Sequence, residues 1–285
     1  MQRDRKAVTP EAAIRALPRD LFIPDQIFVL NEINYWVPVN RQEDPERWRA
    51  AVDADDAVVT QTAFDPSIPA EYRNAATGAG VEAMSSNSTP HLVRRMLEAL
   101  DLQPGMTVLE IGTGTGWNAA LLAQLTGAAS VTTVEIDPAL ADRARTALER
   151  VSCPVDVITG DGELGHPANA PYDRVICTAA VSTLPYAWVR QTRAGGIILA
   201  PWGPIHPDWP LCRLVVDEDG TAHGRFTAPS WFMPLRGQRP AKSTTQDAEE
   251  RWKALGEPTL DRYGVTVTPG GQTIWLDSPT NPVHP

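Results

Sequence analysis

A glycine-rich turn and two acidic residues follow three predicted strands in the middle of the chain. The apolar run Met106–Ile111 leads into Gly112–Gly116 (GTGTG) and then into a helical run. Glycines at such a turn let the main chain bend sharply and let a ligand approach its N–H groups. Glu135 ends the next strand, where a carboxylate can accept both hydroxyls of a ribose. Asp161 follows the third strand, so the pattern predicts a site for a cofactor that contains a nucleoside.

The spacing of the glycines distinguishes two cofactors. A dinucleotide fingerprint, G-x-G-x-x-G, requires glycine at position 117, which is Trp117 here. The pattern E-x-G-x-G-x-G, which starts at Glu110, is typical of S-adenosylmethionine sites. A nicotinamide enzyme is the weaker alternative, and a plain tight turn with a surface acid accounts for only one of the three elements. We therefore predict S-adenosylmethionine as cofactor, with S-adenosylhomocysteine as product, bound by Glu110, Gly112, Thr113, Gly114, Gly116, Glu135, Ile136, Asp161 and Gly162.

Short β-branched runs alternate with helical runs in the middle of the chain. The expected strands are Met106–Ile111, Ser130–Ile136, Val155–Thr159, Asp173–Thr178 and Gly196–Ala200, with an antiparallel pair at Leu211–Val216 and Thr221–Phe226. This alternation predicts an α/β fold with a parallel, doubly wound sheet and helices on both faces. With the glycine turn, that is the Rossmann-like fold of class I S-adenosylmethionine-dependent methyltransferases.

Ser88 and Thr89 precede a predicted helix that starts at Pro90. Capping of that helix explains both hydroxyls by itself, and His91 would then be a first-turn surface or packing residue. Trp202 lies in a proline-rich stretch after the fifth strand, where a peptide groove and ordinary packing are both open interpretations.

Several of these segments together resemble the protein L-isoaspartyl (D-aspartyl) O-methyltransferase family. They are Ser88–His91, Leu102–Trp117, Gly160–Gly162, Pro171–Ile176, Arg193–Gly196 and Phe232–Leu235, with an echo of the family's N-terminal pattern in Ile14–Pro24. The resemblance implies an S-adenosylmethionine-dependent carboxyl O-methyltransferase and places Ser88 at the site of methyl transfer. We take Thr89, His91, Trp202 and Phe232 as candidate substrate residues.

Two stretches depart from the family pattern: Asp25–Met84 and the roughly fifty residues after Leu235. The chain therefore divides into three regions. We predict an N-terminal helical and irregular substrate-side region (1–84), a methyltransferase domain (85–236) and a C-terminal extension with a helix and a hairpin (237–285). With these additions the chain resembles the branch that tailors ribosomally made peptides (RiPP biosynthesis of lanthipeptides and graspetides), and the closing segment 264–279 is similar to the tail of such enzymes. Such an enzyme esterifies an Asp (or isoAsp) side chain of a precursor peptide, including crosslinked ones, and the ester closes to an aspartimide (succinimide) or rearranges to isoaspartate. General repair of protein L-isoaspartate is the alternative; a small-molecule methyltransferase and a non-catalytic cofactor-binding module are further ones.

Composition narrows the possible partners. The chain has 285 residues, a net charge of −10 and no basic run, which argues against a nucleic-acid partner because phosphate binding needs clustered Lys and Arg. No apolar stretch is long enough to predict a membrane span. The three cysteines are widely spaced, so neither a disulfide framework nor a metal site is predicted, and we expect a cytoplasmic protein.

Overall fold

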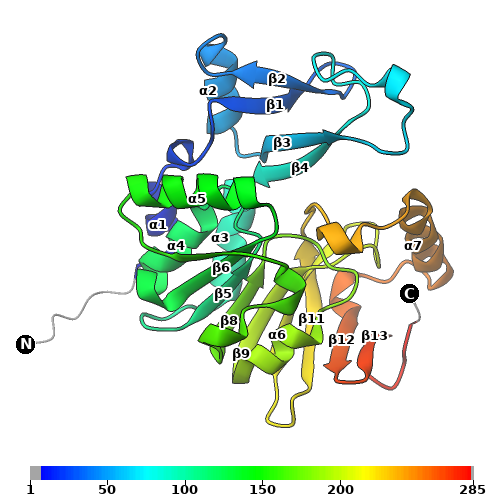
Figure 1. Ribbon diagram of the computed structural model, residues 1–285. Helices are drawn as coiled ribbons and strands as arrows, with labels where there is room; N and C mark the ends of the chain where they lie inside the picture. The colour runs from blue at the N-terminus through cyan, green and yellow to red at the C-terminus, as the bar shows by residue number, and fades with distance from the viewer. Residues whose placement is uncertain (1–7, 284–285) are drawn as a thin grey trace, which may run out of the picture.

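The computed structural model describes residues 8–283, and its main sheet has nine strands in the order β13-β12-β11-β10-β9-β8-β5-β6-β7 (Figure 1). The parallel strands are β5 (Val108–Ile111), β6 (Val131–Glu135), β7 (Asp156–Thr159), β8 (Tyr172–Cys177) and β9 (Thr192–Pro201). The antiparallel strands are β10 (Pro210–Val216), β11 (Ala222–Pro229), β12 (Tyr263–Thr268) and β13 (Gly271–Leu276). The doubly wound α/β fold predicted from the sequence is confirmed.

Helices cover both faces of this sheet. Helices α1 (Pro10–Ala16), α3 (Pro90–Ala99), α4 (Trp117–Thr126) and α5 (Pro138–Arg150) share one apolar core with it, and α6 (Tyr186–Gln191) belongs to the other. Neighbouring strand residues alternate between the two cores: Val108 lies in the first and Leu109 in the second. Because both faces are covered, β5 is apolar except for Glu110 and is buried throughout.

A second, four-stranded antiparallel sheet precedes the main one. Its strands are β1 (Gln26–Leu30), β2 (Trp36–Asn40), β3 (Val58–Phe64) and β4 (Val81–Asn87), in the order β2-β1-β3-β4. Helix α2 (Pro45–Asp53) packs on it through a small core that contains Trp48. The sequence predicted irregular structure here, because Pro38 and frequent turn residues interrupt the alternation that marks a strand. In Figure 1 this N-terminal sheet lies above the main sheet.

The tail continues the main sheet. The predicted helix is α7 (Lys242–Ala254), and the predicted hairpin is β12 and β13, whose first strand pairs with β11. Short 3-10 helices connect the other elements at Arg19–Leu21, Ala70–Tyr72, Ala128–Ser130, Gly162–Leu164, Pro167–Asn169, Arg236–Gln238 and Leu260–Arg262. Within residues 8–283, none of the helices combines the length and apolar content that crossing a bilayer requires.

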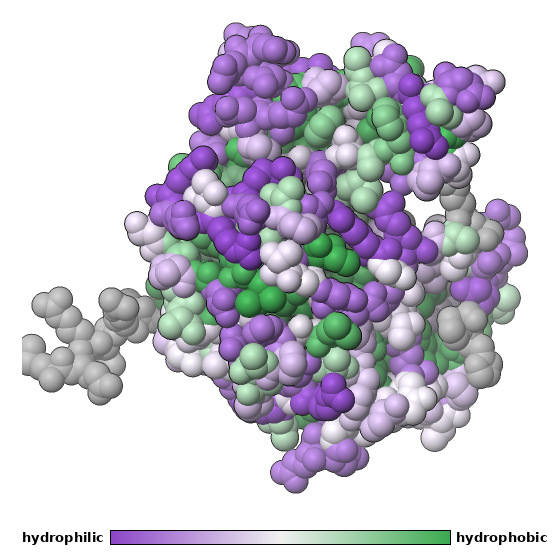
Figure 2. All heavy atoms as spheres, viewed as in Figure 1, coloured by the Kyte–Doolittle hydropathy of each residue, from purple (hydrophilic) through white to green (hydrophobic). Residues whose placement is uncertain are grey.

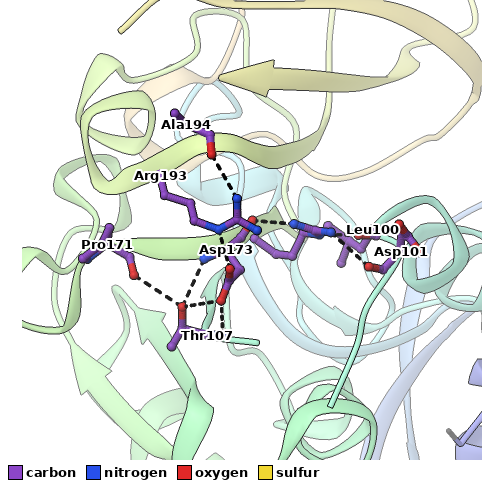
Figure 3. Close-up of polar contacts among 8 residues, drawn as sticks. Leu100, Asp101, Thr107, Pro171, Asp173, Arg193 and Ala194 are labelled. Carbon is purple, nitrogen blue, oxygen red and sulfur yellow. Dashed lines mark hydrogen bonds and ion pairs between the residues drawn. The ribbon is translucent and has the colours of Figure 1, made fainter. Parts of the chain in front are cut away.

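A polar network holds the amino ends of the central strands (Figure 3). Asp173 accepts hydrogen bonds from the main-chain N–H and the hydroxyl of Thr107, at 2.8 and 3.0 Å, and pairs with Arg193 at 2.5 Å. The neighbouring Arg174 donates to the carbonyls of Leu100 and Asp101. Since parallel strands share one direction, a network at their amino ends leaves their carboxyl ends free for a site.

Candidate active site

A cavity of about 310 Å³ lies at the carboxyl ends of β5 and β6, beneath the N-terminal sheet. Figure 2 shows apolar residues in the hollow between the N-terminal sheet and the main body. The lining comes from Ala83–Thr89 at the end of β4, Ile111–Thr115 after β5, Val134–Ile136 at the end of β6, Asp161–Glu163 after β7 and Trp231–Gly237 after β11. Three of the predicted cofactor elements therefore meet in one cavity.

The glycine turn forms one side of the cavity. Gly112 has φ of 91°, and a Cβ atom there would lie 2.7 Å from the hydroxyl of Thr178, so only glycine fits. The N–H of Gly114 donates to Glu135 Oε2 across 2.9 Å. This bond joins the turn after β5 to the end of β6 and sets the distance between the two.

Two acidic residues, an isoleucine and a glycine line the predicted cofactor side of the cavity. Glu135 is a carboxylate that is 5% exposed, and its other oxygen accepts the N–H of Asp137 at 3.1 Å. Ile136 follows with an aliphatic side chain that is 44% exposed, and Asp161 and Gly162 complete this side. A carboxylate beside an exposed aliphatic group fits a ribose with an attached adenine, because the first can accept hydroxyl hydrogens and the second can cover an aromatic face.

Two predicted cofactor residues do not line the cavity. Glu110 is completely buried and accepts hydrogen bonds from Thr133 and Asn118 at 2.6 and 2.7 Å. Burial raises its pKa to about 7. Thr133 is also bonded, at 2.7 Å, to the hydroxyl of Thr113, which does line the cavity, so Glu110 lies below the turn and supports it.

Gly116 is the other cofactor candidate outside the cavity. It has φ of 86° at the start of α4, and a Cβ atom there would lie 3.4 Å from Ala144 and Leu148 of α5. The structure thus gives Gly116 a position where two helices approach closely.

Ser88 lines the cavity between β4 and α3. Its hydroxyl has no hydrogen-bond partner among residues 8–283, so it is free to bind a ligand. Thr89 also lines the cavity and is the residue before α3, but its hydroxyl makes no capping bond. Asp55 caps this helix instead, accepting the N–H of His91 at 3.0 Å. Capping therefore does not account for the two hydroxyls.

The structure separates the remaining substrate candidates. Phe232 lines the cavity. His91 lies outside it, exposed, with its ring 2.9 Å from Asp55. Trp202 is completely buried and packs edge-on against Phe226, so it has a core position rather than the open one that a substrate residue requires.

An ion pair lies beside the cavity and involves one of its lining residues, Arg236. Asp137 accepts hydrogen bonds from Gln61 of β3, at 3.0 Å, and from Arg236, at 2.9 Å. These bonds hold the pKa of Asp137 at about 2. Nearby, Arg239 pairs with Glu82 of β4 at 3.1 Å. The Gln61–Asp137 and Arg239–Glu82 contacts join the N-terminal sheet to the main body.

The sequence interpretation missed several lining residues. Thr178 follows β8 directly, as Gly112 follows β5. Its position at the carboxyl end of a parallel strand is a sequence signal that could have identified it as a lining residue. Trp36, Trp231 and Arg236 carry no comparable local signal, because they reach the cavity only through long-range packing.

Comparison with known families gives one match over most of the chain. The model of the family described as protein-L-isoaspartate(D-aspartate) O-methyltransferase matches residues 52–240. That range contains every cavity-lining residue except Trp36.

Individual proteins agree with the family match. The chain is 40% identical over 159 residues to a protein-L-isoaspartate O-methyltransferase of Pyrococcus horikoshii, covering 55% of this chain and 72% of that protein. It is 42% identical over 173 residues to the protein of the same name in Ignicoccus hospitalis, covering 59% and 82%. A solved structure of a protein-L-isoaspartate O-methyltransferase superposes with a TM-score of 0.57 at 18% identity, covering 81% of this chain and 89% of that one. At 18% identity, the similarity to this solved structure shows a shared fold.

Proposed function

Because the chain belongs to the protein-L-isoaspartate(D-aspartate) O-methyltransferase family, we propose that it esterifies the free carboxylate of isoaspartyl residues in peptides and proteins. The chain is an S-adenosylmethionine-dependent O-methyltransferase. The observation that carries the substrate proposal is the position of Ser88, whose unpartnered hydroxyl lines the same cavity as Gly112, Gly114 and Glu135. A donor for the substrate and the elements for the cofactor thus share one space.

The cofactor would be held by the turn after β5 and by the acids after β6 and β7. Glu135 would accept the ribose hydroxyls, Ile136 would cover the adenine, and Asp161 would accept from its amino group. Gly112 to Gly114 would place main-chain groups beside the amino-acid part. When bound, S-adenosylmethionine would supply an electrophilic methyl group: a carboxylate oxygen would gain the methyl group as the bond from methyl to sulfur breaks, and S-adenosylhomocysteine would leave.

The chain does not need to supply a base for this reaction. A carboxyl group with an ordinary pKa of about 4 is ionised at neutral pH and is already the nucleophile. The protein has to align the carboxylate and keep water out. In our proposal the hydroxyl of Ser88 donates to one carboxylate oxygen and leaves the other to react.

The charges around the cavity suit a reactive carboxylate. Arg236 is the only cationic side chain among the described lining residues, and it is already paired with Asp137. A free cation would stabilise the substrate's charge and reduce its nucleophilicity. A neutral donor such as Ser88 orients the carboxylate at a smaller cost in reactivity.

The ester product then has a route to further chemistry. Methylation turns the carboxylate into an ester with a good leaving group. The adjacent backbone nitrogen attacks the ester carbonyl, loses its proton and expels methanol, which gives a five-membered succinimide (aspartimide). Hydrolysis of that ring yields aspartyl and isoaspartyl products. These later steps need no residue of this chain.

Mass spectrometry of a synthetic isoaspartyl peptide with enzyme and S-adenosylmethionine tests the proposal. We expect the peptide to gain one methyl group, which mild base removes, and later to lose methanol. The same peptide with ordinary aspartate is the matched control and should stay unmodified. Equal methylation of both peptides, or a methyl group that survives base, would contradict the proposal.

A dedicated modified-peptide substrate is the second candidate. The observation that favours it is Trp36, a cavity residue from β2, which precedes the region matched by the family model. We place this candidate second because the relatives reported above carry the name of the isoaspartyl enzyme. It would take first place if the isoaspartyl peptide were inert and a crosslinked precursor peptide were methylated on aspartate.

A further inference from the structure

We propose that Trp36 and Trp231 bind an apolar or aromatic side chain next to the isoaspartyl residue, so that the enzyme prefers peptides with such neighbours. The inference rests on the proposed function, since it concerns the substrate of the same cavity. It adds a selectivity that an isoaspartyl group alone does not provide.

The surroundings of the nine tryptophans single out these two. Five of them, Trp48, Trp117, Trp188, Trp252 and Trp275, donate their indole N–H to a protein oxygen. Trp202 and Trp209 are buried in the protein interior. Trp36 and Trp231 remain: both line the cavity, and neither indole N–H has a partner among residues 8–283. Each therefore offers a ligand both an apolar ring and a free donor, the combination that makes tryptophan frequent at binding surfaces.

The side chain of Trp231 is exposed to solvent, but its ring is held by stacking on Trp209. Its side chain is 60% exposed, and its ring stacks on Trp209 with 5.5 Å between centroids and 22° between planes. Trp209 is 7% exposed and lies directly against Gly203, where a Cβ atom would overlap its ring. One face of Trp231 thus rests on a fixed support, so little side-chain freedom is left to lose when a ligand covers the other face.

Trp36 contributes from the N-terminal sheet. It pairs with Leu30 in the β1–β2 ladder, and its main chain packs so closely under Gly78 that a Cβ atom there would lie 2.5 Å from the carbonyl oxygen of Trp36. The backbone of this residue is therefore fixed on both sides. Trp36 comes from the N-terminal sheet and Trp231 from the segment after β11, and both line the same cavity. In our proposal the peptide contacts the two residues from opposite parts of the chain.

Charge favours an apolar neighbour over an acidic one. The cavity carries the carboxylates of Glu135, Asp161 and Glu163, and its only described cation, Arg236, is paired with Asp137. Arg239 at the rim is paired with Glu82. An acidic flanking residue would find no free cation there, whereas a phenylalanine ring can stack on an exposed indole.

Two isoaspartyl peptides that differ only in their flanking residues test the inference. One carries phenylalanine on both sides of the isoaspartyl residue and the other carries serine. Binding is measured by calorimetry in the presence of S-adenosylhomocysteine, and methylation is measured by mass spectrometry. We expect the phenylalanine peptide to bind about tenfold more tightly to the native enzyme, and Trp231→Ala or Trp36→Ala to remove most of that difference.

Controls separate selectivity from damage to the fold or to the reaction. The affinity for S-adenosylhomocysteine should stay within about twofold in both tryptophan variants, because neither residue belongs to the predicted cofactor side of the cavity. Tyr72→Ala, which removes an exposed aromatic side chain outside the cavity, should leave the preference intact. Equal binding of the two peptides to the native enzyme would overturn the inference even if both were methylated. Selective binding without methylation would support the inference and contradict the proposed function.

Discussion

The guanidinium of Arg19 donates a hydrogen bond to the main-chain carbonyl of Ser88, with 3.4 Å between nitrogen and oxygen. Arg19 is 6% exposed and also donates to the carbonyls of Val52, Ala54 and Asp56. One buried side chain thus connects the N-terminal segment, the end of α2 and the residue that we place at the methyl-transfer site. The segment Ile14–Pro24, which resembles the family's N-terminal pattern, thus contains the arginine that connects these parts of the structure.

Arg19→Ala should lower the free energy of unfolding by about 3 kcal/mol, because several buried carbonyls lose their donor. Urea unfolding followed by circular dichroism measures this change. Arg15→Ala is the matched control, since among residues 8–283 Arg15 pairs only with Glu11, on the surface, and its loss should cost less than about 0.5 kcal/mol. Equal effects of the two substitutions would contradict the role of Arg19.

Ser88→Ala should reduce turnover of an isoaspartyl peptide by about 100-fold while S-adenosylhomocysteine still binds, since one positioned donor to a reacting group is lost. Single-turnover methylation and calorimetry measure the two effects. Ser86→Ala, which removes another cavity hydroxyl from the same segment, is the control and should keep most of the activity. Full activity in Ser88→Ala would exclude the assigned role.

Glu135→Gln should weaken S-adenosylhomocysteine binding by roughly 10- to 100-fold, because the charged acceptor for the ribose is lost. The amide oxygen can still accept the N–H of Gly114, so the turn should keep its shape. Calorimetric titration gives the affinity. Glu163→Gln is the control, because it changes a carboxylate of the same cavity that does not lie on β6. The affinity of this variant for S-adenosylhomocysteine should stay within about threefold of the native value. An unchanged affinity in Glu135→Gln would rule out the ribose contact.

The buried Glu110 should make stability depend on pH. Burial raises its pKa from 4.5 to about 7, so between these values the folded chain keeps a proton that the unfolded chain has released. The free energy of unfolding should therefore fall by up to about 1.4 kcal/mol per pH unit over that range, and by about 3 kcal/mol in total. The stabilising contribution is complete below pH 4.5 and is lost as the pH passes 7.

Glu110→Gln supplies the comparison for this pH dependence. The variant cannot titrate at this position, so the difference in unfolding free energy between native chain and variant should change steadily from pH 4.5 to 7. Urea unfolding at several pH values gives both curves. Curves that run parallel over this range would show that Glu110 keeps an ordinary pKa.

Much of the cofactor side of the cavity could be predicted from the chain alone. Gly112 and Asp161 follow strands and Glu135 ends one, and parallel strands bring their carboxyl ends to one edge. Their proximity thus follows from the order of elements. Glu110 shows the limit of this reasoning, because motif spacing does not tell which way a strand residue points.

Local patterns in the chain predict the alternation of strands and helices, the glycine turn, the acids at the strand ends and the candidate hydroxyl of Ser88. These features are local, and a parallel α/β sheet converts their order directly into position. Three further features appear first in the folded chain: Trp36 reaches the cavity, Trp202 is buried, and Arg19 donates to the carbonyl of Ser88. Each of these depends on packing between segments far apart in the chain, which no local pattern of residues encodes.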